Sequence, residues 1–168
     1  MNPETTSCGA EGPAGRAGLA FQATAALEAL AERMGRELDR HAAAHGLSDA
    51  KLEMLGVLSC CSNRRACLYD LGDRLGVTRP NITKLVDGLE RCGLVERLPH
   101  PADRRMVQAH LTPEGERIAR EALPGRAERI ERLWAALDED ELETLIGLLR
   151  RAGARAGAAE HAPLAAPA

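Results

Sequence analysis

The chain has 168 residues, of which 28% are charged, and its formal net charge is −3 at neutral pH. This length suits one domain with a hydrophobic core, or one compact domain with loose ends, and leaves little room for two domains. No apolar run approaches the roughly 18 residues of a transmembrane helix, and residues 1–18 lack the basic and then apolar order of a signal peptide. We therefore expect a cytoplasmic protein that does not bind membranes.

The charge is unevenly distributed along the chain. Residues 64–107 hold nine basic and six acidic side chains, a local balance of +3, whereas residues 1–63 and 113–151 each carry −3. A positive middle between two negative flanks suits a chain that binds a polyanion through one face and itself through another. Residues 1–18 and 154–168 are rich in small residues and proline, so we expect flexible ends.

The first two predicted elements are helices. From Leu19 to His45 apolar residues recur every three or four positions, which predicts one long amphipathic helix that Gly46 ends. Ser48 has the residue type of an N-cap, and a second helix is predicted from there to about Ser62. The apolar stripe of the first helix consists of Leu27, Leu30, Met34, Leu38 and His41.

A short helix, a tight turn and another helix follow. Three leucines at helical spacing in residues 68–75 predict the short helix, and Gly76 supplies the left-handed residue that ends it. Thr78 is placed to cap the next helix with its hydroxyl, Pro80 fits the first turn, and Gly93 ends the helix. The side chains predicted to face inward from this helix are Ile82, Leu85, Val86 and Leu89.

The outward side of this helix, near its start, is rich in hydrogen-bond donors. The side chains are Arg79, Asn81, Thr83 and Lys84. From a helix in the major groove of DNA, such groups reach base edges and phosphates. We therefore predict a recognition helix, with solvated surface positions as the alternative for each residue.

Two short strands joined by a basic loop come next. Residues 94–98 predict one strand, and alternation over residues 106–111 predicts the second. Two prolines stiffen the connection, which ends in Asp103, Arg104 and Arg105 and is too long for a two-residue hairpin turn. Helix, turn, helix, strand, basic loop and strand in this order predict a winged helix-turn-helix. The alternative for the arginine pair is ordinary surface charge.

Two helices complete the predicted fold. Thr112 followed by a proline opens a helix that should run to about residue 137, but Pro124 falls inside it and predicts a kink or a break. Asp138 and Glu141 have the spacing of a capping box for the last helix, which Gly153 is expected to end. The stripe of that helix consists of Leu142, Leu145, Ile146 and Leu149.

The predicted fold is mainly α with a small β-hairpin: a winged helix-turn-helix DNA-binding lobe plus a helical dimerisation lobe from the first and last helices. Within one domain of residues 19–153, we assign residues 48–112 to the winged unit and residues 19–47 and 113–153 to dimerisation. The long apolar stripes exceed what the winged unit covers, and a second copy is the simplest partner. A two-fold dimer places two recognition helices roughly 34 Å apart on a near-palindromic site.

The cysteines allow two interpretations. Five cysteines without regular spacing favour reduced thiols over disulfides. Two arginines follow the second helix and favour the thiolate form of a nearby cysteine, which a redox sensor requires; the candidates are Cys60, Cys61 and Cys67. The alternative is that the cysteines at helix ends, Cys92 among them, are small buried apolar residues.

Metal binding and enzymatic activity have little support. His41 and His45 stand one helical turn apart, a spacing that can hold a metal, yet no Cys-x-x-Cys and no acidic cluster completes a ligand set. Helix-end packing is the expected role, so no metal and no cofactor is expected. Phe21 and Trp134 are expected in the core, with a ligand pocket as the alternative. Phosphate loops, nucleophile elbows and His-Glu-x-x-His are missing from the sequence, so we do not expect an enzyme.

The linked motifs resemble a known family. The run from Asp70 to Arg97, then Asp103-Arg104-Arg105 and Leu111-Thr112-Pro113-Glu114-Gly115, is similar to MarR-type transcriptional regulators over about residues 27–151. The resemblance implies a homodimeric repressor that binds double-stranded DNA at a near-palindromic operator and is released by a small organic effector. The alternative is a thiol-based oxidant-sensing repressor of the same fold. It also implies that Asp103 steadies the wing while Arg105, aided by Arg104, enters the minor groove.

Overall fold

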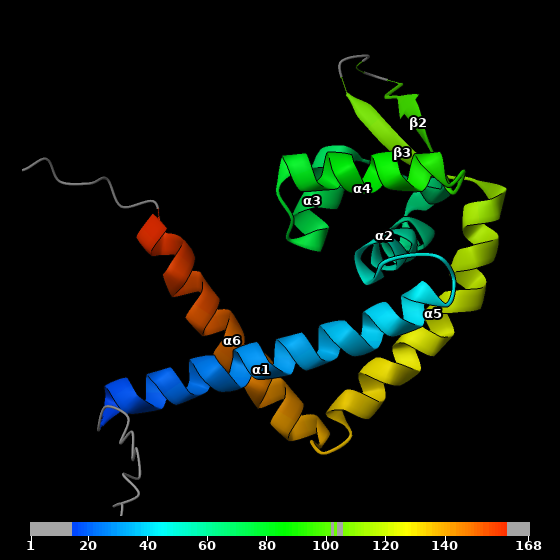
Figure 1. The fold of residues 1–168 in the computed structure, drawn as a ribbon. Coiled ribbons are helices and arrows are strands. Elements are labelled where there is room, and N and C mark those ends of the chain that lie inside the picture. Colours follow the sequence, from blue (N-terminus) through cyan, green and yellow to red (C-terminus); the bar gives the residue numbers. More distant parts are fainter. Residues whose placement is uncertain (1–14, 102, 104–105, 161–168) are drawn as a thin grey trace, which may run out of the picture. The chain divides into compact units, whose positions relative to one another are not determined.

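The structure, a computed structural model, describes residues 15–101, 103 and 106–160, with side chains described up to residue 154. The chain divides into two compact units, residues 1–129 and residues 130–168. In chain order the elements are α1 (Arg16–Ala43), α2 (Asp49–Cys60), η1 (Ser62–Arg64), β1 (Arg65–Cys67), α3 (Leu68–Leu75), α4 (Arg79–Arg91), β2 (Val95–Pro99), β3 (Val107–Leu111), α5 (Pro113–Trp134) and α6 (Glu139–Glu160). Figure 1 labels the helices and two of the strands. The mainly helical fold class is confirmed.

Helix α1 is the long first helix that the sequence predicts. It begins at Arg16 rather than Leu19, and the chain leaves it through Gly46, whose positive φ of 73° suits a residue without a Cβ. Its apolar stripe is covered only towards the C-terminus, where Leu38 is buried. The expectation that Phe21 lies in the core is wrong, because its side chain is 68% exposed.

Helix α2 lies at the centre of the hydrophobic core. Leu52, Met54, Leu55 and Leu58 are all buried, so the helix has apolar neighbours on more than one side, as a central helix requires. The predicted side-chain cap at Ser48 is wrong, since its hydroxyl makes no capping hydrogen bond. Instead, the Asp49 backbone N–H donates to the Asp39 carboxylate at 2.8 Å.

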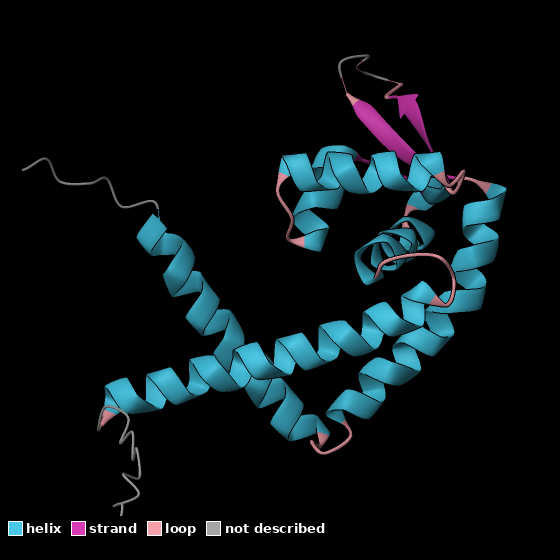
Figure 2. Cartoon of the chain, in the orientation of Figure 1, coloured by secondary structure: helices cyan, strands magenta, loops and turns pink. Residues whose placement is uncertain are grey.

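The sheet has three strands in the order β1-β3-β2, both pairs antiparallel, rather than the two-stranded hairpin that was expected. Figure 2 shows β2 and β3 side by side. The unpredicted strand is β1, in which Arg65 pairs with His110 of β3. Along β3, Ala109 and Leu111 point into the core, while Val107 at the strand start is exposed. Since strands flank β3 on both sides, even Gln108 is buried.

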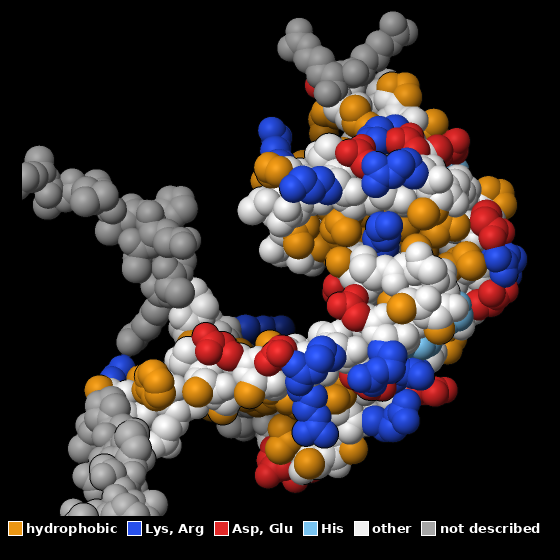
Figure 3. Space-filling view, in the orientation of Figure 1, with side chains coloured by type: hydrophobic (Ala, Val, Ile, Leu, Met, Phe, Trp, Pro, Cys, Tyr) orange, Lys and Arg blue, Asp and Glu red, His pale blue; other side chains and the backbone are white. Residues whose placement is uncertain are grey.

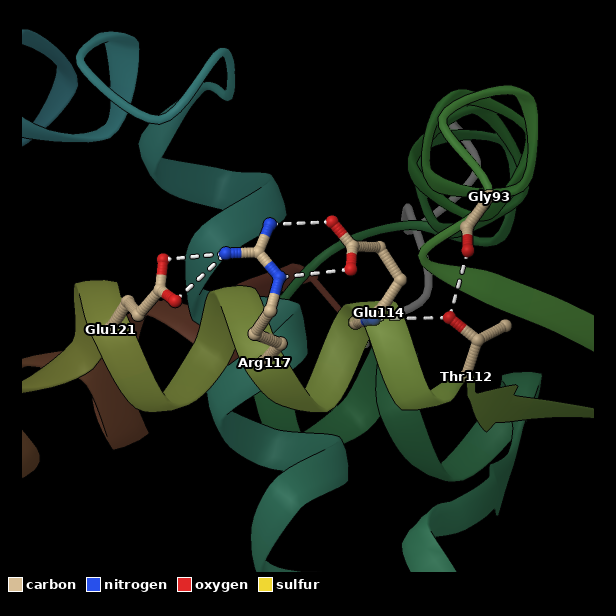
Figure 4. Close-up of polar contacts among 6 residues, drawn as sticks. Gly93, Thr112, Glu114, Arg117 and Glu121 are labelled. Carbon is tan, nitrogen blue, oxygen red and sulfur yellow. Dashed lines mark hydrogen bonds and ion pairs between the residues drawn. The ribbon is translucent and has the colours of Figure 1, made fainter.

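The start of α5 is anchored to the residues that open strand β2. As predicted, Thr112 caps the helix: its hydroxyl oxygen accepts from the Gly115 N–H at 3.0 Å and its hydroxyl donates to the Gly93 carbonyl at 2.7 Å (Figure 4). The first turn passes so close to the start of β2 that a Cβ on Gly115 would lie 2.1 Å from the Leu94 carbonyl oxygen. Only glycine fits this position without a backbone shift.

Helix α5 does not break at Pro124. It runs as one helix with Pro124 inside it and bends along its course (Figure 1). Two side chains donate hydrogen bonds to carbonyls beside the proline. His41 Nε2 donates to the Ala122 carbonyl at 2.8 Å, and Arg129 Nη1 donates to the Gly125 carbonyl at 2.8 Å. The carbonyl that loses its helical donor to Pro124 is that of Arg120, four residues earlier, so these two bonds add contacts beside the proline and do not replace the missing one.

Helix α6 belongs to the second unit. Its predicted capping box is present, because the Asp138 N–H donates to Glu141 Oε2 at 3.0 Å and the Glu141 N–H donates to Asp138 Oδ1 at 2.9 Å. The prediction that Gly153 ends the helix is wrong, since α6 continues to Glu160. Within the described part of the chain, no helix has the length and apolar character that crossing a membrane requires.

Candidate nucleic-acid interface

The turn between α3 and α4 is tight and fixes the angle at which α4 leaves. Gly76 ends α3 in the left-handed conformation, with φ 63°, as the sequence predicts. The Val77 N–H then donates to the Gly72 carbonyl at 3.0 Å, and a Cβ on Gly72 would lie 3.2 Å from the Val77 oxygen. The expected hydroxyl cap at Thr78 is wrong, because that side chain makes no capping hydrogen bond.

Helix α4 has one face in the core and the other in solvent. Its buried side chains include Ile82, Val86 and Leu89, which pack with α2 and the sheet. The donor-rich residues of the first two turns are all exposed: Arg79, Asn81, Thr83 and Lys84. The Thr83 hydroxyl donates to the Arg79 carbonyl at 3.0 Å, which leaves its oxygen available as an acceptor. The structure thus places all four predicted side chains on the solvent-exposed side of α4, near its N-terminus.

The connection between β2 and β3 is only partly described. Arg104 and Arg105 lie outside the described residues. Asp103 is exposed, and its carbonyl accepts from the Met106 N–H at 2.9 Å. The Met106 carbonyl in turn accepts from the His100 N–H at 2.9 Å, so the two strands stay paired through residues beyond their ends.

An ion-pair cluster that the sequence did not predict joins α4 to β2. Arg97 of β2 donates to the carboxylates of Asp87 and Glu90 on α4. Partial burial lowers the pKa of Arg97, but its hydrogen bonds to the two carboxylates outweigh this effect, so the net shift is upward. The contact crosses from a strand to a helix, and no local spacing in the sequence signals it.

A groove of about 500 Å³ lies between the end of α2 and the middle of α5. Its wall is apolar at Leu123 and Pro124, and cationic side chains line it at Arg64 and Arg120. Arg64 has a positive φ of 54° and its Nε lies 3.5 Å from Glu116. Arg64 is one of the two arginines that the sequence places beside the candidate redox cysteines, but its nearness to α5 depends on the tertiary fold and has no local signal.

The cysteines and histidines are only partly as expected. Cys67 is buried and Cys61 half-buried, but the expectation that Cys60 and Cys92 are buried is wrong, since both are exposed. Nη1 of Arg74 lies 3.5 Å from the Cys61 sulfur. His41 contacts α5, and its ring centroid is 5.3 Å from that of His45. Among the described residues, no group of three or more His, Cys, Asp or Glu could hold a metal ion.

Comparison with known proteins places these features in one family. Residues 52–107 match the model of the MarR family. The transcriptional repressor YetL of Bacillus subtilis is 30% identical over 120 residues, which span 71% of this chain and 72% of YetL.

Solved structures agree with this match. Sco3205 of Streptomyces coelicolor, a MarR family regulator in complex with DNA, superposes with a TM-score of 0.77 at 23% identity, covering 85% of this chain and 91% of Sco3205. A cysteine-to-serine mutant of MarR from E. coli, complexed with operator DNA, superposes with a TM-score of 0.70 at 25% identity, covering 83% of this chain and 99% of that protein.

Proposed function

Because the chain belongs to the MarR family of DNA-binding transcriptional regulators, which are not enzymes, we propose that it is a homodimeric, site-specific repressor released from its operator by a small organic ligand. The main support for a DNA-binding surface is the set of exposed hydrogen-bond donors on the first two turns of α4. The opposite face of this helix is buried in the core. A helix held in this way presents the same side chains to every operator.

The roles of individual residues follow from this geometry and from the family. Arg79 and Asn81 read base edges in the major groove, Lys84 contacts phosphates, and the Thr83 oxygen, which is left as an acceptor, accepts from a base amino group. Arg105, with Arg104 beside it, enters the minor groove, and Asp103 steadies the wing. The winged unit comprises residues 48–112.

The dimer is formed by helices at both ends of the domain, residues 19–47 and 113–153. Large apolar side chains on these helices stay exposed in a single chain, among them Leu27 on α1 and Ile146 and Leu149 on α6. Exposed apolar surface on long helices supports burial against a second copy. Two recognition helices then meet a near-palindromic operator.

The groove between α2 and α5 is where the effector binds. Its apolar wall and the guanidinium group of Arg120 suit a small organic anion, whereas Arg64 lies beside the Glu116 carboxylate in the same groove and is already paired. The ligand releases DNA only if it binds the DNA-incompetent arrangement of the dimer more tightly than the competent one. We expect organic acids such as benzoate derivatives to release DNA from the wild-type protein. Arg120→Ala should lose this response while its DNA affinity stays unchanged.

DNA binding is tested by fluorescence anisotropy at two salt concentrations. The probe is DNA from upstream of the protein's own coding sequence, with an unrelated duplex beside it. Arg79→Ala should weaken binding about tenfold, since one bidentate base contact contributes about 1–3 kcal/mol. The matched control is Arg117→Ala on α5, which should bind as the wild type does. Weak, equal binding of the wild type to both duplexes, at both salt concentrations, contradicts the proposal.

Thiol sensing by the same repressor is the second candidate. It is favoured by the exposed Cys60 next to Cys61, whose sulfur lies 3.5 Å from the Arg74 guanidinium. Under this alternative, peroxide releases DNA and dithiothreitol restores binding, and Cys61→Ser abolishes the response while Cys92→Ser does not. A variant without cysteines that still responds to peroxide excludes it.

A further inference from the structure

Arg97 contacts the recognition helix on three successive turns. Its Nη1 donates to Glu90 and its Nη2 to Asp87, and Nη2 also lies 3.4 Å from the carbonyl oxygen of Thr83. These partners are four and three residues apart, so they lie on one face of α4. The Arg97 side chain is only 27% exposed, and its own backbone N–H points to Glu90 at 3.4 Å. The guanidinium therefore fixes the position of α4 along β2.

Arg97 also compensates the acidic side chains of the recognition helix. Space-filling representation shows acidic and basic side chains side by side over α4 (Figure 3). Without a nearby cation, Asp87 and Glu90 would face the phosphates of bound DNA as two unpaired negative charges, which repel the polyanion. Thr83, whose backbone carbonyl is the third partner of Arg97, carries the hydroxyl proposed to touch DNA.

We propose that Arg97 is a positioning residue for DNA binding, which holds α4 in register with the strands of the wing and neutralises the carboxylates beside the DNA contacts. The inference depends on the proposed function, because it assumes that α4 and the wing bind one DNA site together. Strand β2, which carries Arg97, leads directly into the wing connection. A helix in the major groove and a wing in the minor groove must keep a fixed separation to engage the same duplex.

A lysine cannot replace this arginine. The planar guanidinium bonds two carboxylates and a carbonyl through separate N–H groups, whereas an ammonium is a single point charge on a flexible stem. Arg97→Lys therefore keeps the charge and loses the geometry. The chain offers a matched control in Arg117, which donates to Glu114 and Glu121 but joins residues within α5 alone (Figure 4).

The experiment compares Arg97→Lys and Arg117→Lys by anisotropy, with a fluorescent duplex selected by the wild-type protein from a random-sequence pool. We expect Arg97→Lys to lower DNA affinity about tenfold, as loss of a charge-assisted hydrogen bond does. Arg117→Lys should bind as the wild type does, and both variants should unfold within about 2 °C of the wild type. Wild-type affinity in Arg97→Lys, or an equal loss in Arg117→Lys, overturns the positioning role. A wild-type protein that selects no duplex overturns the proposed function instead.

A second variant pair separates positioning from charge and does not depend on the folding of Arg97→Lys. Removing two negative charges in Asp87→Asn/Glu90→Gln should tighten DNA binding if charge alone matters. The positioning role predicts the opposite, a loss of about threefold or more, because Arg97 loses its anchors. The control Glu114→Gln/Glu121→Gln should leave DNA affinity unchanged. Tighter binding by Asp87→Asn/Glu90→Gln overturns the proposal.

Discussion

The winged unit and the long helices at the two ends of the described chain bury their apolar side chains to different extents. In the winged unit, Leu52, Leu55 and Leu71 are fully buried. On α1, by contrast, Leu19 is 67% exposed, and on α6 Leu148 is 52% exposed. The winged unit buries its apolar side chains within one chain, whereas the end helices leave exposed apolar surface, which supports the proposed dimer. One chain thus combines a DNA-binding unit that has a buried core with end helices that carry exposed apolar side chains.

The largest effect is expected from a cavity in the hydrophobic core around α2. Leu55→Ala removes a fully buried side chain from α2 and should lower the free energy of unfolding by about 4 kcal/mol, measured by urea denaturation. The control Glu121→Ala on the exposed face of α5 should change it by less than about 0.5 kcal/mol. A loss below about 1 kcal/mol in Leu55→Ala would mean that neighbouring side chains rearrange to fill the cavity, which would contradict a tightly packed core.

The next largest effect is expected where α5 approaches the start of β2. Gly115→Ala places a Cβ against the Leu94 carbonyl and should cost about 3 kcal/mol in unfolding free energy. Gly153→Ala, in an α6 position with nothing within 4 Å, should instead gain up to about 1 kcal/mol from helix propensity. Equal effects of the two substitutions, measured by urea denaturation, would contradict the tight junction between these elements.

The end helices are tested by charges on their exposed apolar face. Ile146→Glu/Leu149→Glu should weaken self-association about 100-fold, which corresponds to nearly 3 kcal/mol, measured by sedimentation equilibrium. Arg151→Glu, on the opposite side of the same helix, changes charge without touching this face and should leave the dimer intact. A double variant that remains as dimeric as the wild type would remove α6 from the interface.

Two threonines at helix starts allow a smaller, paired test. Thr112→Ala removes a hydroxyl that caps α5 and should cost about 1 kcal/mol of unfolding free energy. Thr78→Ala should cost much less, because the Thr78 side chain makes no capping bond. Thermal and urea denaturation of both variants checks this, and a larger loss for Thr78→Ala would contradict the observed capping.

The smallest expected effect depends on pH. Hydrogen bonds from Arg117 are the main reason that the pKa of Glu114 lies below its ordinary value. A lowered pKa in the folded state means that the contribution is present above the unfolded-state pKa of about 4 and is lost as pH falls through the folded-state pKa. Glu114→Gln should therefore lower the melting temperature slightly at neutral pH and lose this effect as pH falls through the folded-state pKa. An effect that grows on acidification would contradict this sign.

Local signals in the sequence predicted the elements whose cause is local. Gly76 ends α3 because its positive φ suits glycine, and the capping box at Asp138 and Glu141 joins residues three apart. The four donors on α4 follow from helical periodicity, which separates them from the buried face. Each of these features depends on residues within one or two helical turns.

Features that depend on distant partners were missed. Strand β1 has three residues and forms only because β3, more than forty positions later, offers a free edge: Arg65 pairs with His110. The predicted break at Pro124 does not occur, although α5 bends, and His41 from α1 contacts the carbonyl of Ala122, 81 positions later, which no local spacing signals. For the same reason the Arg97 cluster could not be read from spacing. Gly153 failed as a stop signal because a single glycine costs only about 1 kcal/mol in a helix.

The most direct test of the whole account is hydroxyl-radical footprinting of a selected duplex, combined with the mass of the complex in solution. The account predicts two chains on one duplex and two protected segments about 10 base pairs apart, centre to centre. Arg79→Ala should reduce the protection of both segments equally, since each segment contacts one copy of α4. One chain per duplex, or a single protected segment, would contradict a dimer that presents two copies of α4 to one operator.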